Sequence, residues 1–181
     1  PGQDTYRISV KKENEMNPNG KVSVYLHEAI EIGDTIEVTA PAGDFFLDVE
    51  STRPVTLISG GVGVTPMMSM LETISKTTPT RPVAFLHGAR NKALHAFDED
   101  VRTLMSTMED TTMLTLYSDE NRMLTKELLA ENVLPTSDIY VCGPVPFMKA
   151  MINTLYELGF AADRVHFEFF GPAVSLEPVT V

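Results

Sequence analysis

The feature that most constrains the fold is an alternation of short apolar runs with helical patterns after Pro54. Runs that are apolar on both faces are typical of strands inside a parallel sheet, which helices cover on both sides. The predicted strands are residues 55–59, 83–88, 113–118, 139–143 and 165–169. The predicted helices between them are residues 66–75, 98–108, 125–131 and 146–158. The sequence therefore predicts an α/β fold with a five-stranded, parallel, doubly wound sheet of the nucleotide-binding type.

Residues 1–52 follow a different pattern. Apolar and polar residues alternate over residues 6–11, the period of a half-buried strand, and the alternation resumes over residues 36–38. Residues 23–28 suit one short helix. Three short pieces are too few to close a barrel or a sandwich. We therefore expect residues 1–52 to be the remnant of an antiparallel β domain and residues 53–181 to form the α/β domain.

The composition argues against several kinds of partner. The sequence has 14 lysines and arginines against 25 aspartates and glutamates, a formal net charge of −11. This balance argues against a nucleic-acid partner, which needs clustered basic residues. No apolar run is long enough to span a bilayer, which argues against a membrane partner. The single cysteine cannot form an internal disulfide, so we expect a cytoplasmic protein.

A glycine-rich turn directly follows the first predicted strand of the α/β domain. Small residues let backbone N–H groups approach a phosphate, and the N-terminus of the next helix adds partial positive charge. Thr65 is expected to cap that helix and Pro66 to occupy its first position. A tight connection without a ligand is the alternative, and the spacing matches neither G-x-G-x-x-G nor the P-loop. We predict phosphate binding by Gly60, Gly61, Val62, Gly63, Val64, Thr65 and Pro66.

Further candidates lie where other predicted strands end, because the carboxyl ends of parallel strands line the ligand crevice. At the end of the second strand, Arg90 could contact phosphate and His87 could pack near a ribose; a solvated arginine is the alternative. At the end of the fourth strand, Cys142 would face the crevice, and Gly143 and Pro144 would form a ligand-facing turn. A lone cysteine without an adjacent base is more often a small buried hydrophobe than a nucleophile.

A carboxylate, Glu168, stands among aromatic residues at the end of the last predicted strand. A carboxylate in that position could serve proton transfer, or it could shield a planar ring system. A glutamate on an edge strand with no ligand is the alternative, and without further context it is the preferred interpretation.

These four features, in this order, resemble the ferredoxin-NADP reductase superfamily. The glycine turn looks like its G-G-x-G-x-T-P loop, and Cys142-Gly143-Pro144 looks like its C-G-P nicotinamide motif. Residues 41–46, 57–66 and 170–172 look more specifically like the reductase half of bacterial flavohemoproteins, and the resemblance covers nearly the whole chain. It implies that residues 1–52 are a truncated FAD-binding β-barrel and that residues 53–181 bind NAD(P)H. It also implies a globin domain with haem before them.

The resemblance implies roles for individual residues. In that family the intact enzyme transfers hydride from NAD(P)H to FAD and electrons onward to haem, and it oxidises nitric oxide with O₂ to nitrate. Cys142 would then lie near the nicotinamide, Glu168 would sit beside the flavin, and Phe170 would cover the isoalloxazine face. No metal site is expected in this chain. The implied FAD contacts are Gly20, Val22, Ser23, Phe169, Phe170, Gly171 and Pro172.

The choice between NADH and NADPH should depend on residues 117–122, which end the third predicted strand. A 2′-phosphate needs positive charge, whereas the ribose of NADH tolerates a carboxylate. Asp119 and Glu120 favour NADH, and Ser118 and Arg122 could serve NADPH. We expect NADH.

One departure from the family pattern concerns the flavin. The family's R-x-Y-S stretch, which contacts the flavin, should closely precede Tyr6 and is absent, and the sequence begins at Pro1. We interpret the sequence as part of a longer protein that by itself holds FAD weakly or not at all. Other interpretations are the reductase component of an oxygenase, a ferredoxin or flavodoxin reductase, an isolated nucleotide-binding module, and a purely structural α/β domain.

Overall fold

The structure is a computed structural model that describes residues 5–14 and 17–169. The chain forms two compact units that divide between Asp44 and Phe45. The larger unit holds all the described strands, and the smaller unit holds one described helix. Within the described ranges, every helix is too short or too polar to cross a membrane.

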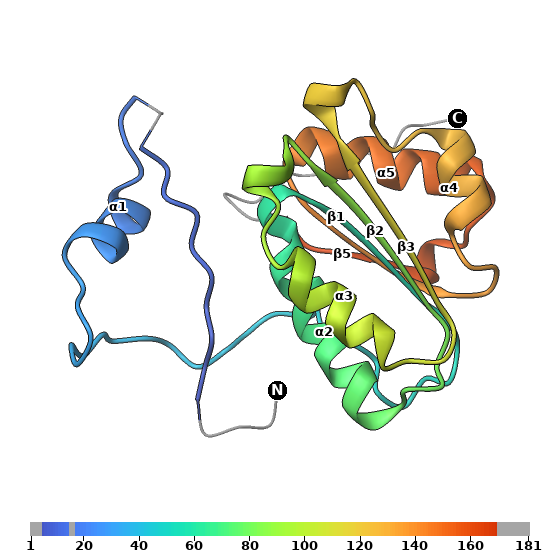
Figure 1. The fold of residues 1–181 in the computed structure, drawn as a ribbon, viewed down its shortest axis with the longest axis horizontal. Helices are drawn as coiled ribbons and strands as arrows, with labels where there is room; N and C mark the ends of the chain where they lie inside the picture. Colours follow the sequence, from blue (N-terminus) through green and yellow to red (C-terminus); the bar gives the residue numbers. More distant parts are fainter. Residues whose placement is uncertain (1–4, 15–16, 170–181) are drawn as a thin grey trace. The chain divides into compact units, whose positions relative to one another are not determined.

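Five parallel strands form the sheet of the larger unit, in the order β3-β2-β1-β4-β5 (Figure 1). All five strands expected from the sequence are present, and the predicted fold class is confirmed. The chain passes from β1 outward to β3 and then returns to the other side of β1 with β4. In such sheets ligands bind beyond the carboxyl ends of the strands, where the strand order reverses. The strands are β1 (Val55–Gly60), β2 (Val83–Ala89), β3 (Thr111–Tyr117), β4 (Asp138–Cys142) and β5 (Val165–Phe167).

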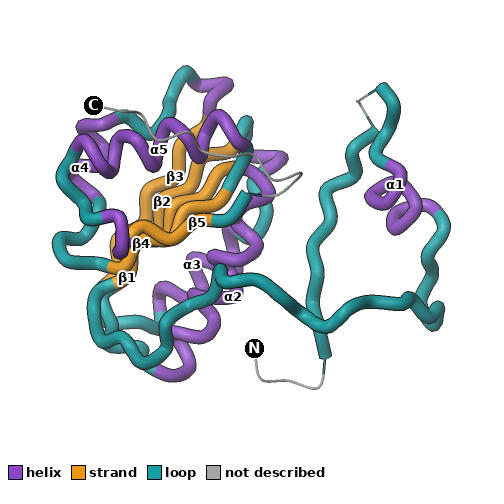
Figure 2. Tube along the Cα trace, turned by 180° about the vertical axis from the view of Figure 1, so that it is seen from behind, coloured by secondary structure: helices purple, strands orange, loops and turns teal. Residues whose placement is uncertain are grey.

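Helices cover both faces of the sheet (Figure 2). One face packs against α2 (Val64–Thr77) and α3 (Asp98–Ser106), and we call it the α2–α3 face. The other packs against α4 (Lys126–Asn132) and α5 (Val145–Glu157), and we call it the α4–α5 face. All four helices expected from the sequence are present. Gly159, just past the end of α5, has φ +87°, the left-handed conformation that commonly ends a helix.

The side chains of β1 show how the core is divided. All six residues of this central strand are buried. Val55 and Leu57 join the hydrophobic core of the α2–α3 face, and Ile58 joins the core of the α4–α5 face. Strand alternation thus explains why the sequence here is a continuous apolar run and not an alternating one.

The described part of the larger unit also contains four short 3₁₀ helices. Three of them follow β1, β2 and β3, at the carboxyl edge of the sheet where ligands are expected. They are η1 (Gly61–Gly63), η2 (Lys92–Leu94), η3 (Ser118–Glu120) and η4 (Ala162–Arg164).

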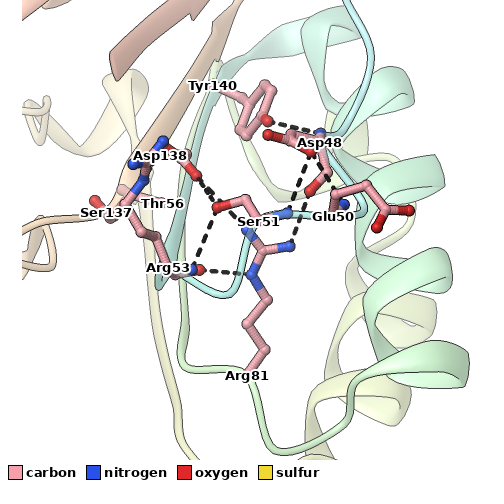
Figure 3. A network of polar contacts seen from close by, with 9 residues as sticks. All are labelled: Asp48, Glu50, Ser51, Arg53, Thr56, Arg81, Ser137, Asp138 and Tyr140. Carbon is pink, nitrogen blue, oxygen red and sulfur yellow. Dashed lines mark hydrogen bonds and ion pairs between the residues drawn. The ribbon is translucent and has the colours of Figure 1, made fainter. Parts of the chain in front are cut away.

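A polar network occupies the opposite, amino edge of the sheet (Figure 3). Its centre is the buried carboxylate of Asp138, the first residue of β4. Arg53 Nε donates to Asp138 Oδ1 at 2.9 Å, and Ser51 Oγ donates to Asp138 Oδ2 at 2.7 Å. The buried Arg81 guanidinium lies 3.7 Å from the same carboxylate.

The same network fastens the segment that leads into β1. The Tyr140 hydroxyl accepts a hydrogen bond from the Asp48 amide at 3.0 Å. Arg81 donates to the carbonyl oxygens of Asp48 and Arg53 at 3.2 and 2.6 Å. Residues 45–54 are therefore bound to the amino edge, far from the carboxyl edge where the glycine turn lies.

The smaller unit contains α1 (Lys21–Glu28), which confirms the short helix expected at residues 23–28. The His27 ring bonds to the Val10 carbonyl at 2.8 Å, and Lys12 pairs with Glu28 at 2.7 Å. The strands expected over residues 6–11 and 36–38 are wrong, because residues 5–14 and 17–44 contain no strand. A strand needs a neighbour to pair its backbone groups, and the described residues supply none. The predicted β-barrel remnant is not confirmed.

Candidate nucleotide-binding site

The carboxyl edge of the sheet gathers the turns that the sequence singles out. Because the strands are parallel, the segments after β1, β2, β3 and β4 all emerge on this edge. Near it, Cys142, Ser59, His87 and Thr115 are register partners across four adjacent strands. These residues form one row on the α2–α3 face. The candidate site is therefore assembled from segments that lie far apart in the sequence.

Helical structure after β1 begins at Gly61, earlier than the helix start at Pro66 that the sequence predicts. Gly61–Gly63 form η1, and α2 begins at Val64 directly behind it. Thr65 lies inside the helix and makes no capping hydrogen bond, so the predicted Thr65 cap is wrong. Pro66 is the third helical residue and not the first. The physical reason is that the 3₁₀ turn already satisfies the amide of Val64, which donates to the carbonyl oxygens of Gly61 and Val62.

The three glycines of the turn differ in what surrounds them. Gly61 has φ +53°, and a methyl group added to it would meet nothing within 4 Å. At Gly63, an added methyl group would lie 2.2 Å from the Cys142 carbonyl oxygen. At Gly60, it would lie 3.0 Å from the Phe147 ring. Gly61 alone of the three faces open space, whereas Gly60 and Gly63 are required by packing.

The start of α2 offers the electrostatics that an anion needs. The helix has 14 residues, and its first turn carries no acidic residue. The helix dipole favours a negative charge there. Since Gly61 leaves the approach open, a phosphate group fits at this turn.

His87 is buried behind the glycine turn. Its Nδ1 lies 2.8 Å from Ser59 Oγ, and its ring stacks on His95 with 4.5 Å between the ring centroids. Burial, together with the nearby His95, lowers the pKa of His87 to about 4. The structure therefore places the His87 side chain in the interior and not on the surface where a ribose would lie.

The ends of β2 and β3 meet at the same edge. The exposed Arg90 accepts a hydrogen bond from the Asp119 amide through its carbonyl oxygen at 3.0 Å. Ser118 begins η3, and Arg122 Nη1 lies 3.8 Å from a Glu120 carboxylate oxygen. Arg90, Ser118 and Arg122 are thus gathered in one region, and the Arg122 charge is partly matched by Glu120.

Cys142 lies in the interior at the end of β4. It is fully buried, and its thiol contacts the Glu168 carbonyl oxygen at 3.7 Å. Burial, assisted by the Glu168 carboxylate, raises the pKa of Cys142 to about 12. The thiol is therefore a neutral packing group. Gly143 is buried and Pro144 is exposed, immediately before α5.

The remaining predicted site residues divide into three groups. Glu168 is exposed and Phe169 is half-buried, and the Phe169 ring meets the Phe167 ring edge-on at 5.8 Å between centroids. Cys142 and Glu168 are thus brought together. Gly20, Val22 and Ser23 belong to the smaller unit, where Ser23 Oγ donates to the Gly20 carbonyl oxygen at 3.3 Å. Phe170, Gly171 and Pro172 lie outside the described residues.

Two residues that the sequence analysis does not single out stand next to the site. Phe147 rests on Gly60 and Gly143, and His95 stacks on His87. The only sequence signal for Phe147 is its position three residues after Pro144, in the first turn of a helix. No local pattern indicates that a ring there would contact glycines on other strands.

A doubly wound parallel sheet with an open glycine at its first strand-to-helix turn defines a dinucleotide-binding domain. The family model of the oxidoreductase NAD-binding domain matches residues 57–153, which include most of β1, the glycine turn and the Cys142-Gly143-Pro144 turn. The chain belongs to this family, and within it to the reductase region of flavohemoproteins.

Similar proteins support this assignment over almost the whole chain. The chain is 47% identical to a flavohemoprotein of Bacillus cereus (strain ATCC 10987 / NRS 248), over 98% of this chain and 48% of that protein. It is 43% identical to a flavohemoprotein of Oceanobacillus iheyensis, over 99% of this chain and 46% of that protein. The chain thus spans about half the length of the curated relatives it matches.

Solved structures agree. The flavohem-like FAD/NAD-binding domain of nitric oxide dioxygenase from Vibrio cholerae O1 biovar El Tor matches with a TM-score of 0.78 and 36% identity. The match covers 90% of this chain and 70% of that one. Phthalate dioxygenase reductase, at 24% identity and a TM-score of 0.72, shares the fold.

Proposed function

We propose that this chain is the electron-input part of a flavohemoprotein, which binds reduced nicotinamide dinucleotide and delivers hydride to FAD. The whole protein then passes electrons to haem in a globin domain and converts nitric oxide and O₂ to nitrate. The observation that carries the proposal is Gly61, an open, left-handed glycine at the start of a helix on the carboxyl edge of the sheet. A cytoplasmic location is part of the proposal.

The diphosphate of the dinucleotide would lie at residues 60–66. Gly61 leaves room for it, the N-terminal end of α2 supplies the partial positive charge of the helix dipole, and Arg90 adds a positive charge at the neighbouring strand end. The buried His87 ring is hydrogen-bonded to Ser59, the residue directly before this turn, and so helps to fix its position. The nicotinamide would then extend along the carboxyl edge towards Gly143 and Pro144.

The end of β5 would face the flavin. When bound, FAD accepts hydride and releases electrons singly. The exposed Glu168 carboxylate and the Phe169 ring suit the edge of a planar ring system, and we assign them this role together with Phe170, Gly171 and Pro172. We assign Gly20, Val22 and Ser23 to the FAD diphosphate. Glu168 would hold or move a proton at its carboxylate oxygens.

Cys142 would be a packing residue beside the nicotinamide and not a nucleophile. Its backbone packs against Gly63, and its buried thiol contacts the Glu168 carbonyl oxygen. The thiol stays protonated at neutral pH, because burial raises its pKa to about 12. It therefore keeps water away from the place where the rings meet and forms no covalent bond in the reaction.

We propose NADH as the preferred dinucleotide. The Glu120 carboxylate lies 3.8 Å from Arg122, so it offsets the positive charge that a 2′-phosphate would need. Asp119 adds a second negative charge in the same turn. Measuring kcat/KM of the full-length protein for NADH and NADPH tests this choice, and a preference for NADPH would contradict it.

The experiment for the function itself supplies FAD to the purified full-length protein and follows NADH consumption by absorbance. Calorimetric titration with NADH gives the affinity in parallel. We expect saturable binding and FAD-dependent oxidation of NADH. Binding without oxidation by the full-length protein would indicate an inactive nucleotide-binding module, and no binding would contradict the proposal.

A further inference from the structure

One aromatic ring at the carboxyl edge packs against three glycines. Phe147 lies in the first turn of α5, and its half-buried ring packs on the core of the α4–α5 face. A methyl group added to Gly60 would lie 3.0 Å from the ring's Cγ and Cδ1 atoms. At Gly143 it would lie 2.8 Å from Cδ1, and at Gly88 it would lie 3.8 Å from Cε2. The ring thus rests on the ends of β1 and β2 and on the turn after β4.

These contacts explain why glycine stands at two of the positions. Gly60 is extended and Gly143 is fully enclosed, so neither needs glycine for open access to a ligand. A side chain at Gly60 or Gly143 would push the ring away, since protein interiors are close-packed. The Phe147 ring, and not a phosphate group, therefore requires glycine at position 60. At Gly143 the ring acts together with the Gly60 backbone, whose N and Cα atoms would lie 3.1 and 3.2 Å from an added methyl group.

The ring also links the two turns that the proposed function uses. Gly60 is the first residue of the turn assigned to the diphosphate, and Gly143 belongs to the turn assigned to the nicotinamide. On the other side of the strands, Gly63 packs against the Cys142 backbone at the start of α2. The two turns are held from both sides: by backbone contact on one side and by the Phe147 ring on the other.

We propose that Phe147 is a positioning residue for the dinucleotide: its ring sets the separation between the diphosphate turn and the nicotinamide turn. This inference rests on the proposed function. A ligand that contacts both turns depends on their separation, whereas a ligand that contacts only the diphosphate turn does not. Since small misplacements of a bound group are costly, the loss should appear in NADH affinity first.

The test compares NADH with ADP, which carries the diphosphate but no nicotinamide. In the purified protein, Phe147→Leu should weaken NADH binding about tenfold, roughly the effect of 1.4 kcal/mol, and leave ADP binding within about twofold. Phe147→Tyr retains the ring and should restore NADH affinity. The matched control is Phe160→Leu, a second half-buried phenylalanine that packs on the same α4–α5 core after the end of α5. It should change neither affinity.

A double-mutant cycle gives an independent readout. Gly60→Ala should weaken NADH binding in the wild-type background and have a smaller effect in a Phe147→Ala background, because the clash partner is gone. Equal losses of NADH and ADP affinity, additive effects in the cycle, or an equal loss in Phe160→Leu would overturn the role of Phe147. If the wild-type protein bound neither NADH nor ADP, the proposed function would fail as well.

Discussion

Burial changes the protonation of the two stacked histidines, His87 and His95, that lie behind the glycine turn. His87 Nδ1 is hydrogen-bonded to Ser59, while the buried Nε2 atoms of both rings have no partner in the described structure. Burial lowers the pKa of both histidines, so both rings are neutral in the folded protein near neutral pH. The sequence alone could not predict the burial of His87, because the motif at the end of β2 places His87 at a strand end but does not indicate which way its side chain faces.

The pH dependence of stability follows from His87. Its pKa falls from 6.5 to about 4 on folding, so the unfolded chain binds more protons between these values. Its contribution is fully present above the unfolded pKa and is lost as the pH falls towards the folded pKa. Between about pH 7.5 and pH 5 we expect a loss of roughly 2 kcal/mol from this residue. Urea unfolding of wild type and His87→Gln measures it: the variant should lose less stability over this interval, and parallel pH profiles would contradict the assignment.

Cys142 gives a second prediction for a single residue. Burial and the Glu168 carboxylate raise its pKa from 9.0 to about 12, so its thiolate fraction near neutral pH falls about a thousandfold. A thiol reagent such as DTNB should therefore react with the native protein about a thousandfold more slowly than with the unfolded chain. Similar rates in the two states would show that Cys142 is accessible and reactive.

The strands and helices of the larger unit are predictable from sequence, because a sheet buried on both faces requires continuous apolar runs in its strands. The continuous apolar run of β1 is an example. Helix caps are less predictable: Thr65 has the expected residue type, but η1 satisfies the next amide first. The strands expected over residues 6–11 and 36–38 fail for a different reason. Their alternation is local, whereas pairing requires a neighbouring strand.

The amino-edge network is an element-scale feature that fixes β4 and the segment before β1. Replacing Asp138 with Ala would leave the Arg81 guanidinium, whose side chain is 4% exposed, without its carboxylate. Removing one partner from a buried ion pair costs about 3–5 kcal/mol, and we expect that loss in urea unfolding. NADH affinity should stay unchanged, because the network lies at the edge opposite the glycine turn.

Arg53→Ala is the matched control for Asp138→Ala. The Arg53 side chain is 50% exposed and bonds to the same carboxylate, so its loss should cost about 1 kcal/mol or less. Equal losses of stability in the two variants would contradict the central role of the buried carboxylate.

For the molecule as a whole, the fold and the position of the site follow from the order of apolar runs and turns. The contacts between turns do not, because they depend on which strands become neighbours. Phe147 meets Gly60 and Gly143 only after β1 and β4 pair. The same holds for Gly63 and Cys142. Sequence therefore indicates the turn that we propose binds the diphosphate, while the structure separates its open glycine from its packing glycines.

That separation defines the most direct measurement, the dissociation constant for NADH of Gly61→Asn. Asparagine tolerates the left-handed conformation, and the added side chain would occupy the open space where the diphosphate should lie. Gly159→Asn is the matched control, since Gly159 also has positive φ and open space but lies past the end of α5. We predict at least about tenfold weaker NADH binding for Gly61→Asn and unchanged binding for Gly159→Asn. Unchanged affinity in Gly61→Asn would contradict the dinucleotide site.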